Sequence, residues 1–134
     1  MLNKTVLQSS RDEINAYLVN KLLPFWFDRS KDQESGGLIT HFARHGNDSG
    51  ENEKSLIAQT RMLYSFSNVF RSGYGSMCKE FAKHGLDFLV NRMRDHRNGG
   101  FCWLVNRRGD ILIGDKILFS RATFLLTSFF FIFK

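Results

Sequence analysis

The chain has 134 residues, of which 43% are hydrophobic and 24% charged, and its formal net charge is +6. This composition is typical of a globular domain and excludes a disordered, collagen-like or low-complexity chain. Cys78 and Cys102 have no cysteine or histidine beside them at a metal-binding spacing, so neither a zinc site nor a disulfide framework is predicted. Residues 1–20 lack the continuous apolar segment of a secretory signal, and a reducing, cytoplasmic location is therefore expected.

The first predicted element is a helix that begins near Ser10. Ser10 and Glu13 have the spacing of a capping box. Apolar residues follow at helical spacing, namely Ile14, Tyr17, Leu18 and Leu22. Pro24 is expected to end or kink this helix, because proline removes a backbone donor and clashes with the preceding turn.

A glycine-containing motif occurs twice, with every matched position 63 residues apart. The first copy consists of Asp32, Gly36-Gly37, Arg44 and Gly46, and the second of Asp95, Gly99-Gly100, Arg107 and Gly109. In each copy the residues after the glycine pair are typical of a short strand that enters a turn. Each copy therefore predicts a small β-hairpin, and the sequence predicts an internal repeat.

Two helices are predicted between the two hairpins, and a further one after the second hairpin. One spans about 53–71 and ends at Ser72-Gly73, and a second is capped by Ser76 and stopped by residues 98–100. Their apolar stripes comprise Leu56, Leu63, Phe66 and Phe70 in the former, and Ala82, Leu86, Leu89 and Met93 in the latter. A fourth helix is expected to begin near Asp115 and to contain the phenylalanine-rich end of the chain.

Units of this kind bury their apolar faces only against neighbouring units, and three or more are usually needed. A closed ring of about six helix pairs of this period would need about 350 to 400 residues. Residues 1–134 are therefore expected to form a single incomplete domain, the N-terminal third of a ring. Residues 117–134 form an atypical hydrophobic tail with no acidic residue, whose apolar stretch at 122–133 is too short to span a membrane.

Three segments in succession resemble the N-terminal part of the N-acylglucosamine 2-epimerase family, which also contains cellobiose 2-epimerases and mannose isomerases. They are LLPFWFDRSKDQESGGLITHFARHG at 22–46, EKSLIAQTRMLYSFS at 53–67 and KHGLDFLVNRMRDHRNGGFCWLVNRRG at 83–109. The resemblance covers about residues 10–118 and implies an all-α fold, a partial (α/α)6 barrel with short β-hairpins after the Gly-Gly turns. It departs from the family pattern after Lys116 and Phe119, where the chain becomes hydrophobic.

The resemblance also implies an activity. Family members epimerise or isomerise a mono- or disaccharide at C2, removing the proton next to the carbonyl and passing through an enediolate, without a metal or other cofactor. Such a step needs a positioned base and a cation or donor at the developing oxyanion. The family's catalytic histidines lie beyond residue 134, so this chain alone is expected to be inactive.

Arg61 is the candidate catalytic and substrate-binding residue, because the family arginine at this position contacts the sugar oxygen. From helix geometry alone, Arg61 lies opposite the predicted core stripe, on the side of Ile57, Tyr64 and Asn68. Both an exposed arginine and a pocket arginine are compatible with that position. Trp103 is a second candidate for substrate binding, because its ring could stack on a sugar ring. The alternative role is to pack the hairpin onto a helix.

The remaining candidates predict little chemistry. His41 and His45 are four residues apart in a hairpin, a separation of about 13 Å that does not favour a metal site. His84 and His96 match no catalytic position of the family.

Two other function classes compete with the enzyme. The chain could be a non-catalytic interaction or carbohydrate-binding fragment that self-associates through exposed apolar surface. Alternatively, arginines between 92 and 108 could bind nucleic acid, but no aromatic RNA-binding pattern or helix-turn-helix spacing accompanies them, so neither a nucleic acid nor a membrane is expected as partner.

Overall fold

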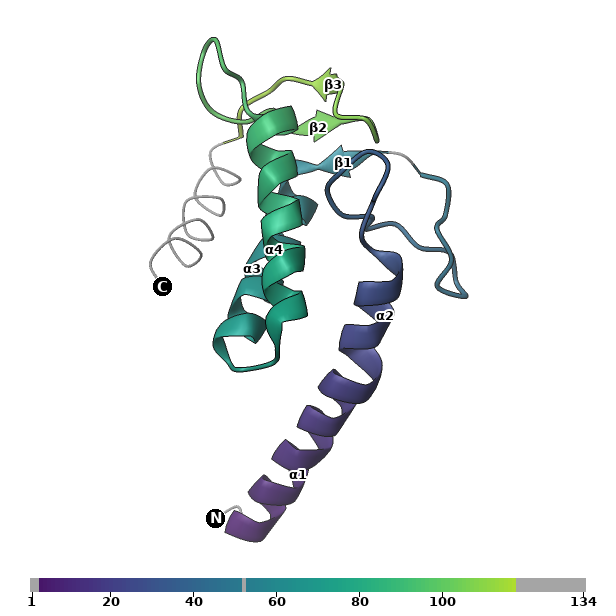
Figure 1. Ribbon diagram of the computed structural model, residues 1–134, viewed down its shortest axis with the longest axis vertical. Coiled ribbons are helices and arrows are strands. Elements are labelled where there is room, and N and C mark those ends of the chain that lie inside the picture. Colours follow the sequence, from purple (N-terminus) through teal and green to yellow (C-terminus); the bar gives the residue numbers. More distant parts are fainter. Residues whose placement is uncertain (1–2, 52, 118–134) are drawn as a thin grey trace.

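The computed structural model describes residues 3–51 and 53–117, which form helices and one small sheet (Figure 1). The helical elements are α1 (Lys4–Tyr17), the π-helical η1 (Leu18–Leu22), α2 (Leu23–Arg29), α3 (Leu56–Arg71), α4 (Ser76–Phe88) and the π-helical η2 (Leu89–Met93). The strands are β1 (Lys54–Ser55), β2 (Leu104–Val105) and β3 (Ile111–Ile113). The fold is thus mostly helical, as the sequence predicts. The fourth predicted helix and most of the apolar tail lie outside the described residues.

The chain is helical from Lys4 to Arg29, and α1 runs through η1 into α2 as one rod (Figure 1). The helix begins earlier than predicted, because Asn3 caps it by accepting a hydrogen bond from the Thr5 amide at 3.2 Å. Ser10 and Glu13 lie inside α1, so the predicted capping box is wrong. Pro24 does not end the helix; it falls in the first turn of α2, directly after the π-helical turns of η1.

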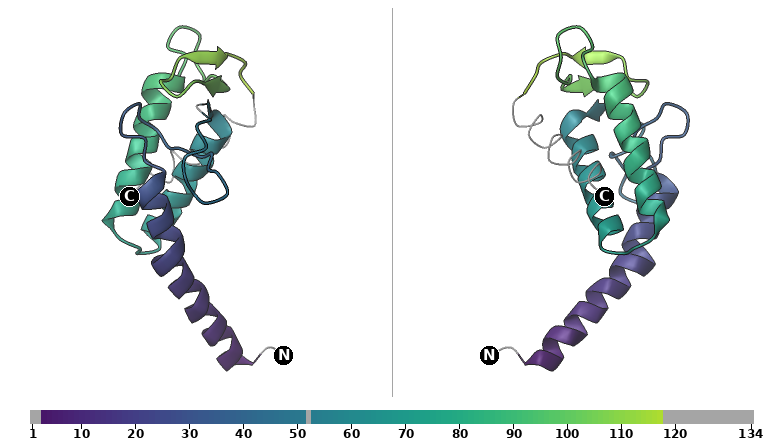
Figure 2. Two further views of the ribbon diagram at one scale, coloured as in Figure 1. Left: turned by 90° about the vertical axis from the view of Figure 1, so that its right-hand side faces the viewer. Right: turned by 60° about the vertical axis from the view of Figure 1, so that its left-hand side comes forward.

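Helices α3 and α4 lie side by side, and the three strands gather at one end of the pair (Figures 1 and 2). Ser55 caps α3 by accepting a hydrogen bond from the Ala58 amide. Gly75, with a φ of +85°, is the N-cap of α4, so the expectation that Ser76 caps this helix is wrong. The helix ends at Met93, before the predicted stop, because Arg94 turns extended and pairs with Phe101.

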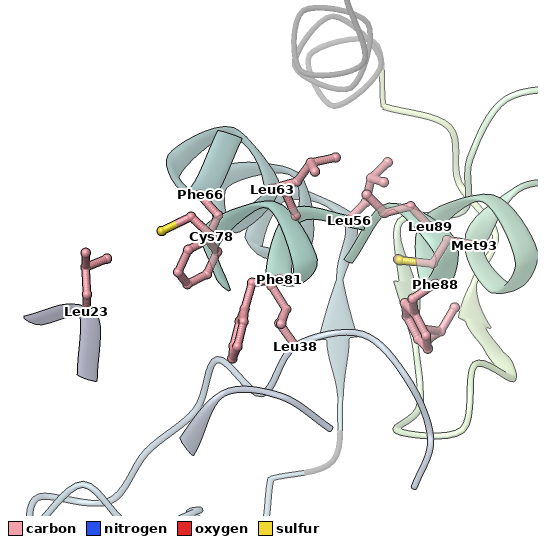
Figure 3. Packing of buried hydrophobic residues seen from close by; sticks show 12 residues of the cluster. Leu23, Leu38, Leu56, Leu63, Phe66, Cys78, Phe81, Phe88, Leu89 and Met93 are labelled. Atoms are coloured by element: carbon pink, nitrogen blue, oxygen red, sulfur yellow. The ribbon is translucent and has the colours of Figure 1, made fainter. Parts of the chain in front are cut away.

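The core lies between α3 and α4 and beneath the segment that contains Leu38 (Figure 3). Leu56, Leu63 and Phe66 of the α3 stripe are buried, as predicted. They pack with residues of α4 and η2, among them Phe81, Ala82, Phe88, Leu89 and Met93. The apolar side of α1 differs, since Ile14 and Tyr17 are exposed.

The internal repeat is present in three dimensions. Lys31 pairs with Leu38, and Arg94 pairs with Phe101 in the same antiparallel manner, 63 residues later. The strand pair Phe42–Asp48 likewise matches the pair Val105–Ile111. We call residues 4–71 the first unit and 76–117 the second, and residues 38–49 and 101–113 hairpin 1 and hairpin 2.

The sheet joins the two units. Its order is β1-β2-β3, with both pairs antiparallel, and Lys54 lies opposite Val105 while Ser55 lies opposite Leu104. The strand of the first unit that leads into α3 is therefore paired with hairpin 2 of the second unit. In the described part of the chain, no helix is long and apolar enough to cross a membrane.

Candidate functional site

Arg61 lies in the second turn of α3, and its side chain is exposed. Its carbonyl accepts a hydrogen bond from the Ser65 hydroxyl at 2.9 Å. Within residues 3–51 and 53–117, its guanidinium has no hydrogen bond or ion pair. The position on the side of α3 away from the core agrees with the helix geometry, and its role in a sugar pocket stays a prediction.

A buried ionic network fixes the start of α3, close to Arg61 along the chain. The Lys54 ammonium donates to Asp32 Oδ2 at 2.8 Å, to the Arg107 carbonyl at 3.0 Å and to the Gly36 carbonyl. The Arg107 guanidinium donates to Asp32 Oδ2 through Nε at 2.9 Å and to Asp48 Oδ2 at 3.1 Å. The network thus connects both hairpins to the residue that precedes the N-cap of α3.

The protonation states follow from this geometry. Burial alone would raise the pKa of Asp32, but hydrogen bonds from Lys54 and Arg107 outweigh it and lower the pKa to about 2. Desolvation lowers the pKa of the Lys54 ammonium, and its hydrogen bond with Asp32 opposes that shift. The Asp32 hydrogen bond raises the pKa of Arg107. At neutral pH the network therefore holds one buried carboxylate between two cations.

Gln59 gives α3 a second attachment to hairpin 1. Its side chain is fully buried; its Nε2 donates to the Leu38 carbonyl at 2.6 Å, and its Oε1 accepts from the Leu38 amide at 2.9 Å. The side chain thus takes the place of a strand partner for Leu38. Because Gln59 is two residues before Arg61, these bonds hold the helical turn that carries the arginine in a fixed position.

A polar surface depression of about 450 Å³ lies between the turn before hairpin 1 and hairpin 2. It is lined by Glu34, Ser35, Asn106, Arg107, Arg108 and Asp110. Neither Arg61 nor Trp103 is among these lining residues. Trp103 is half-buried, and its backbone joins the sheet to α3, since its carbonyl accepts from the Leu56 amide at 2.8 Å. The structure therefore does not bring the two predicted substrate contacts into one depression of the described chain.

The histidines have structural surroundings. His84 Nε2 lies 3.1 Å from the Asp32 carbonyl, and exposed His41 lies 3.7 Å from Glu51. His45 and His96 are exposed. Among the residues with described positions, no group of three or more histidine, cysteine or acidic side chains is arranged to hold a metal ion.

The sequence did not single out Lys54. It marked Asp32 and Arg107 as repeat positions but did not indicate that they form an ion pair. The repeat contains a signal for them. Lys54 follows Asp32 by 22 residues and Lys116 follows Asp95 by 21, and the second pair is also an ion pair, at 2.6 Å. A lysine thus recurs at almost the repeat period. This recurrence indicates that the lysine forms an ion pair with the aspartate that precedes the glycine pair.

Solved structures of sugar epimerases have an architecture similar to that of this chain. The cellobiose 2-epimerase of Spirochaeta thermophila matches 96% of this chain and 31% of its own, with a TM-score of 0.87 and 26% identity. A cellobiose 2-epimerase from Bacillus thermoamylovorans gives a TM-score of 0.86 at 25% identity, over 92% of this chain and 32% of its own. These matches define the class as mostly helical proteins of the sugar-epimerase type.

The family follows from the sequence comparison. Residues 37–129 match the model of N-acylglucosamine 2-epimerase, and the chain belongs to that family. The cellobiose 2-epimerase of Dictyoglomus turgidum is 30% identical over 116 residues, which cover 87% of this chain and 30% of that protein. The D-mannose isomerase of Marinomonas mediterranea is 27% identical over 66% of this chain and 22% of its own length. The chain thus spans less than a third of the curated relatives that it matches.

Proposed function

We propose that this chain is the N-terminal part of a sugar 2-epimerase or aldose–ketose isomerase whose helix pairs form part of an (α/α)6 barrel. Family membership supports the reaction class, since the matched relatives include cellobiose 2-epimerases and a D-mannose isomerase. The observation that carries the site is Arg61, an exposed arginine without an ion pair in the described chain, on a helix held rigidly by Lys54 and Gln59. The substrate class is a mono- or disaccharide.

In the proposed reaction, a base removes the proton at C2 of the open-chain sugar and the charge moves to the carbonyl oxygen. A guanidinium held at that oxygen stabilises the developing oxyanion. Attachment of α3 to both hairpins fixes the backbone that carries Arg61, so that only its side chain has to be ordered for this contact. Neither a metal nor another cofactor takes part in this scheme.

The isolated 134-residue chain is proposed to be inactive, because the family resemblance places the catalytic histidines beyond residue 134. Within the chain, the half-buried His84 has its Nε2 3.1 Å from the Asp32 carbonyl, so this nitrogen already has a partner. Proton NMR of cellobiose or mannose in D2O with this chain should therefore show no loss of the C2 proton signal. Loss of that signal with the purified chain would overturn the proposed inactivity.

Sugar binding tests the role of Arg61 separately from turnover. Saturation-transfer NMR with millimolar cellobiose or mannose should detect weak binding to the chain, and Arg61→Ala should reduce it at least threefold. Arg71→Ala is the matched control, because it removes an exposed arginine from the far end of the same helix. Equal signals for both variants would contradict a substrate contact at Arg61.

A non-catalytic interaction fragment remains the second candidate function. The observation that favours it is the apolar side of α1, where Val6, Leu7, Ile14 and Tyr17 are all exposed. Exposed apolar surface of this extent is typical of an interaction site. A concentration-dependent oligomer with no affinity for sugar would favour this function over the enzyme.

A further inference from the structure

The polar depression of about 450 Å³ extends into a second hollow of about 500 Å³. Arg92 lines the second hollow, and the lining residues common to both are Glu34, Ser35, Arg108 and Asp110. We call the two hollows together the inter-unit groove. One wall is the turn before hairpin 1, and the other is the tip of hairpin 2. Both walls, and the Arg107–Asp32 ion pair that joins them, belong to the described chain.

Hydrogen bonds within the tip of hairpin 2 fix one wall of the groove. The Asn106 side chain accepts from the Arg108 amide at 3.0 Å and from the Asp110 amide at 2.9 Å, and its Nδ2 donates to Asp110 Oδ2 at 2.8 Å. Gly109, with a φ of +95°, leaves room for the stem of Arg92, since a Cβ there would lie 2.8 Å from that stem. The tip therefore has a defined shape, and Arg92 is held against it.

Asp32 fixes the opposite wall. Its Oδ1 accepts hydrogen bonds from the Glu34 amide at 3.2 Å and the Ser35 amide at 3.1 Å, while its Oδ2 binds the Arg107 guanidinium. The backbone on both sides of the groove is thus in place before a ligand arrives. Binding to a site prepared in this way loses less free energy to ordering the protein.

The side chains that line the groove keep many hydrogen-bonding groups unused. Four of them form no hydrogen bond or ion pair with any described residue, and these are Glu34, Ser35, Arg92 and Arg108. Asp110 uses one carboxylate oxygen for Asn106, and Arg107 is already paired with Asp32 and Asp48. The groove therefore offers a ligand two guanidinium groups, two carboxylates and a hydroxyl.

The balance of these charges indicates the class of ligand. Arg92 and Arg108 disfavour a metal cation, and Glu34 and Asp110 disfavour a phosphate or another polyanion. An apolar ligand would desolvate the charges without replacing their hydrogen bonds. A sugar is neutral, and each of its hydroxyl groups both donates and accepts, so it can use side chains of both kinds. We infer that the inter-unit groove is a saccharide-binding site, separate from the proposed contact at Arg61.

Amide-resolved NMR of the isotope-labelled 134-residue chain, titrated with cellobiose, tests this site. The amides of Ser35, Arg108 and Asp110 should shift together, with a dissociation constant on the order of 10 mM, as expected for a groove open to solvent. The groove is then sparsely occupied at millimolar sugar. Inorganic phosphate is the probe for an anion site. If phosphate shifted these amides at lower concentrations than cellobiose did, the inferred ligand class would be wrong.

Substitutions in the groove test which side chains hold the sugar. Glu34→Ala and Arg108→Ala should each raise the dissociation constant at least threefold, because each removes an unused hydrogen-bonding group. The matched controls are Glu80→Ala and Arg97→Ala, which remove an exposed glutamate and an exposed arginine outside the groove. They should change the constant less than twofold. Equal constants for the groove variants and the controls would overturn the inference, as would the absence of shifts at ten times the expected constant.

Arg61→Ala separates this site from the one under the proposed function. It should leave the cellobiose titration of the groove amides unchanged. If their shifts disappeared in Arg61→Ala, the sugar would bind at Arg61 alone, and the inference would fail while the proposed function stood. Persistence of the groove shifts, together with equal saturation-transfer signals for Arg61→Ala and Arg71→Ala, would support the groove and contradict the contact at Arg61.

Discussion

Lys54 shows how a single buried cation can connect segments that are distant in sequence. Its side chain is almost fully buried, and its three donors are used by the Asp32 carboxylate and the carbonyls of Gly36 and Arg107. A buried charge is stable only with such complete pairing. The ammonium therefore fixes the first glycine turn, the second hairpin and the start of α3 relative to one another.

Replacing Lys54 by methionine should strongly destabilise the chain. The change leaves the buried Asp32 with Arg107 as its remaining cation and removes the donor to two carbonyls, so we expect a loss of about 3–5 kcal/mol in the free energy of unfolding. Urea unfolding followed by circular dichroism measures it. Lys83→Met is the matched control, since Lys83 forms an exposed ion pair with Asp87 and should cost less than about 1 kcal/mol. Similar losses for both variants would contradict the assigned role.

Acid should weaken the fold through Asp32. Hydrogen bonds from Lys54 and Arg107 overcome the effect of burial and lower the pKa of this carboxyl to about 2, from an ordinary value of 3.8. Between these values the unfolded chain binds more protons, so the stabilisation is complete above about pH 4 and is lost as the pH falls towards 2. The difference corresponds to about 2 kcal/mol.

Urea unfolding at a series of pH values from about 5 to 2 measures this loss. Asp32→Asn should start from a lower stability and show a shallower decline with acid, because the titrating group is absent. Asp95→Asn provides a comparison at the equivalent site, where the hydrogen bond from Lys116 lowers the pKa of a half-buried carboxyl. Parallel curves for the wild type and Asp32→Asn would show that Asp32 is not the group responsible.

At the scale of an element, the glycine turn before hairpin 1 is determined by both its backbone and its neighbour. Gly37 has a φ of +72°, and a Cβ there would lie 2.8 Å from the ring of buried Phe88. Gly50 has a φ of +78°, but a Cβ there would meet no atom within 4 Å. The two positions therefore share the backbone conformation and differ in packing.

Alanine substitution separates these two effects. Gly50→Ala should cost about 1 kcal/mol, the penalty for a left-handed backbone with a side chain. Gly37→Ala should cost about 1–3 kcal/mol more, because Phe88 is enclosed and cannot move away without disturbing the core. Thermal unfolding of both variants measures the difference. Equal melting temperatures would mean that the ring yields to the added methyl group.

Much of the local structure could be predicted from the sequence. The two hairpins and the α3 stripe were predicted because glycine pairs and apolar spacing depend only on residues that are close together in the sequence. Helix starts were less accurate: Asn3 and Gly75 cap α1 and α4, where Ser10 and Ser76 were expected. A serine favours a cap at any helix start, so its presence cannot exclude an earlier one.

The contacts that fix the candidate site could not be predicted in the same way. Gln59 bonds to Leu38, 21 residues away, and its sequence neighbourhood resembles that of any polar residue on a helix. Arg107 reaches Asp32 across 75 residues. Such pairs depend on how the two units pack against each other. The repeat period by itself does not reveal which residues of the two units come into contact. The position of Arg61 was predicted, whereas the network that holds its helix was not.

At the scale of the whole molecule, the two units share their stabilising contacts. Pairing of β1 with β2, the Arg107–Asp32 ion pair and the packing of Phe88 all cross the boundary between them. Repeat proteins of this kind derive stability from interfaces between neighbouring units as well as from each unit. The two units should therefore unfold together.

The buried thiols allow a test of this cooperativity. Cys78 lies in α4 and Cys102 just before β2; both are free and buried, and burial raises the pKa of each thiol. Each should react with a maleimide only when the structure around it opens. Labelling in mild urea at about pH 8, quantified for both peptides by mass spectrometry, should give opening free energies that agree within about 0.5 kcal/mol.

Arg107→Met should break this agreement. Without its guanidinium, hairpin 2 loses the ion pair to Asp32 and the contact with Asp48, so Cys102 should open more easily than Cys78. The helix pair that buries Cys78 keeps its own core of Leu63, Phe66 and Phe81 and should protect that thiol longer. If Cys102 already labelled much faster in the wild type, with little dependence on urea, hairpin 2 would be an independently opening segment. Arg107 would then contribute to local geometry without coupling the units.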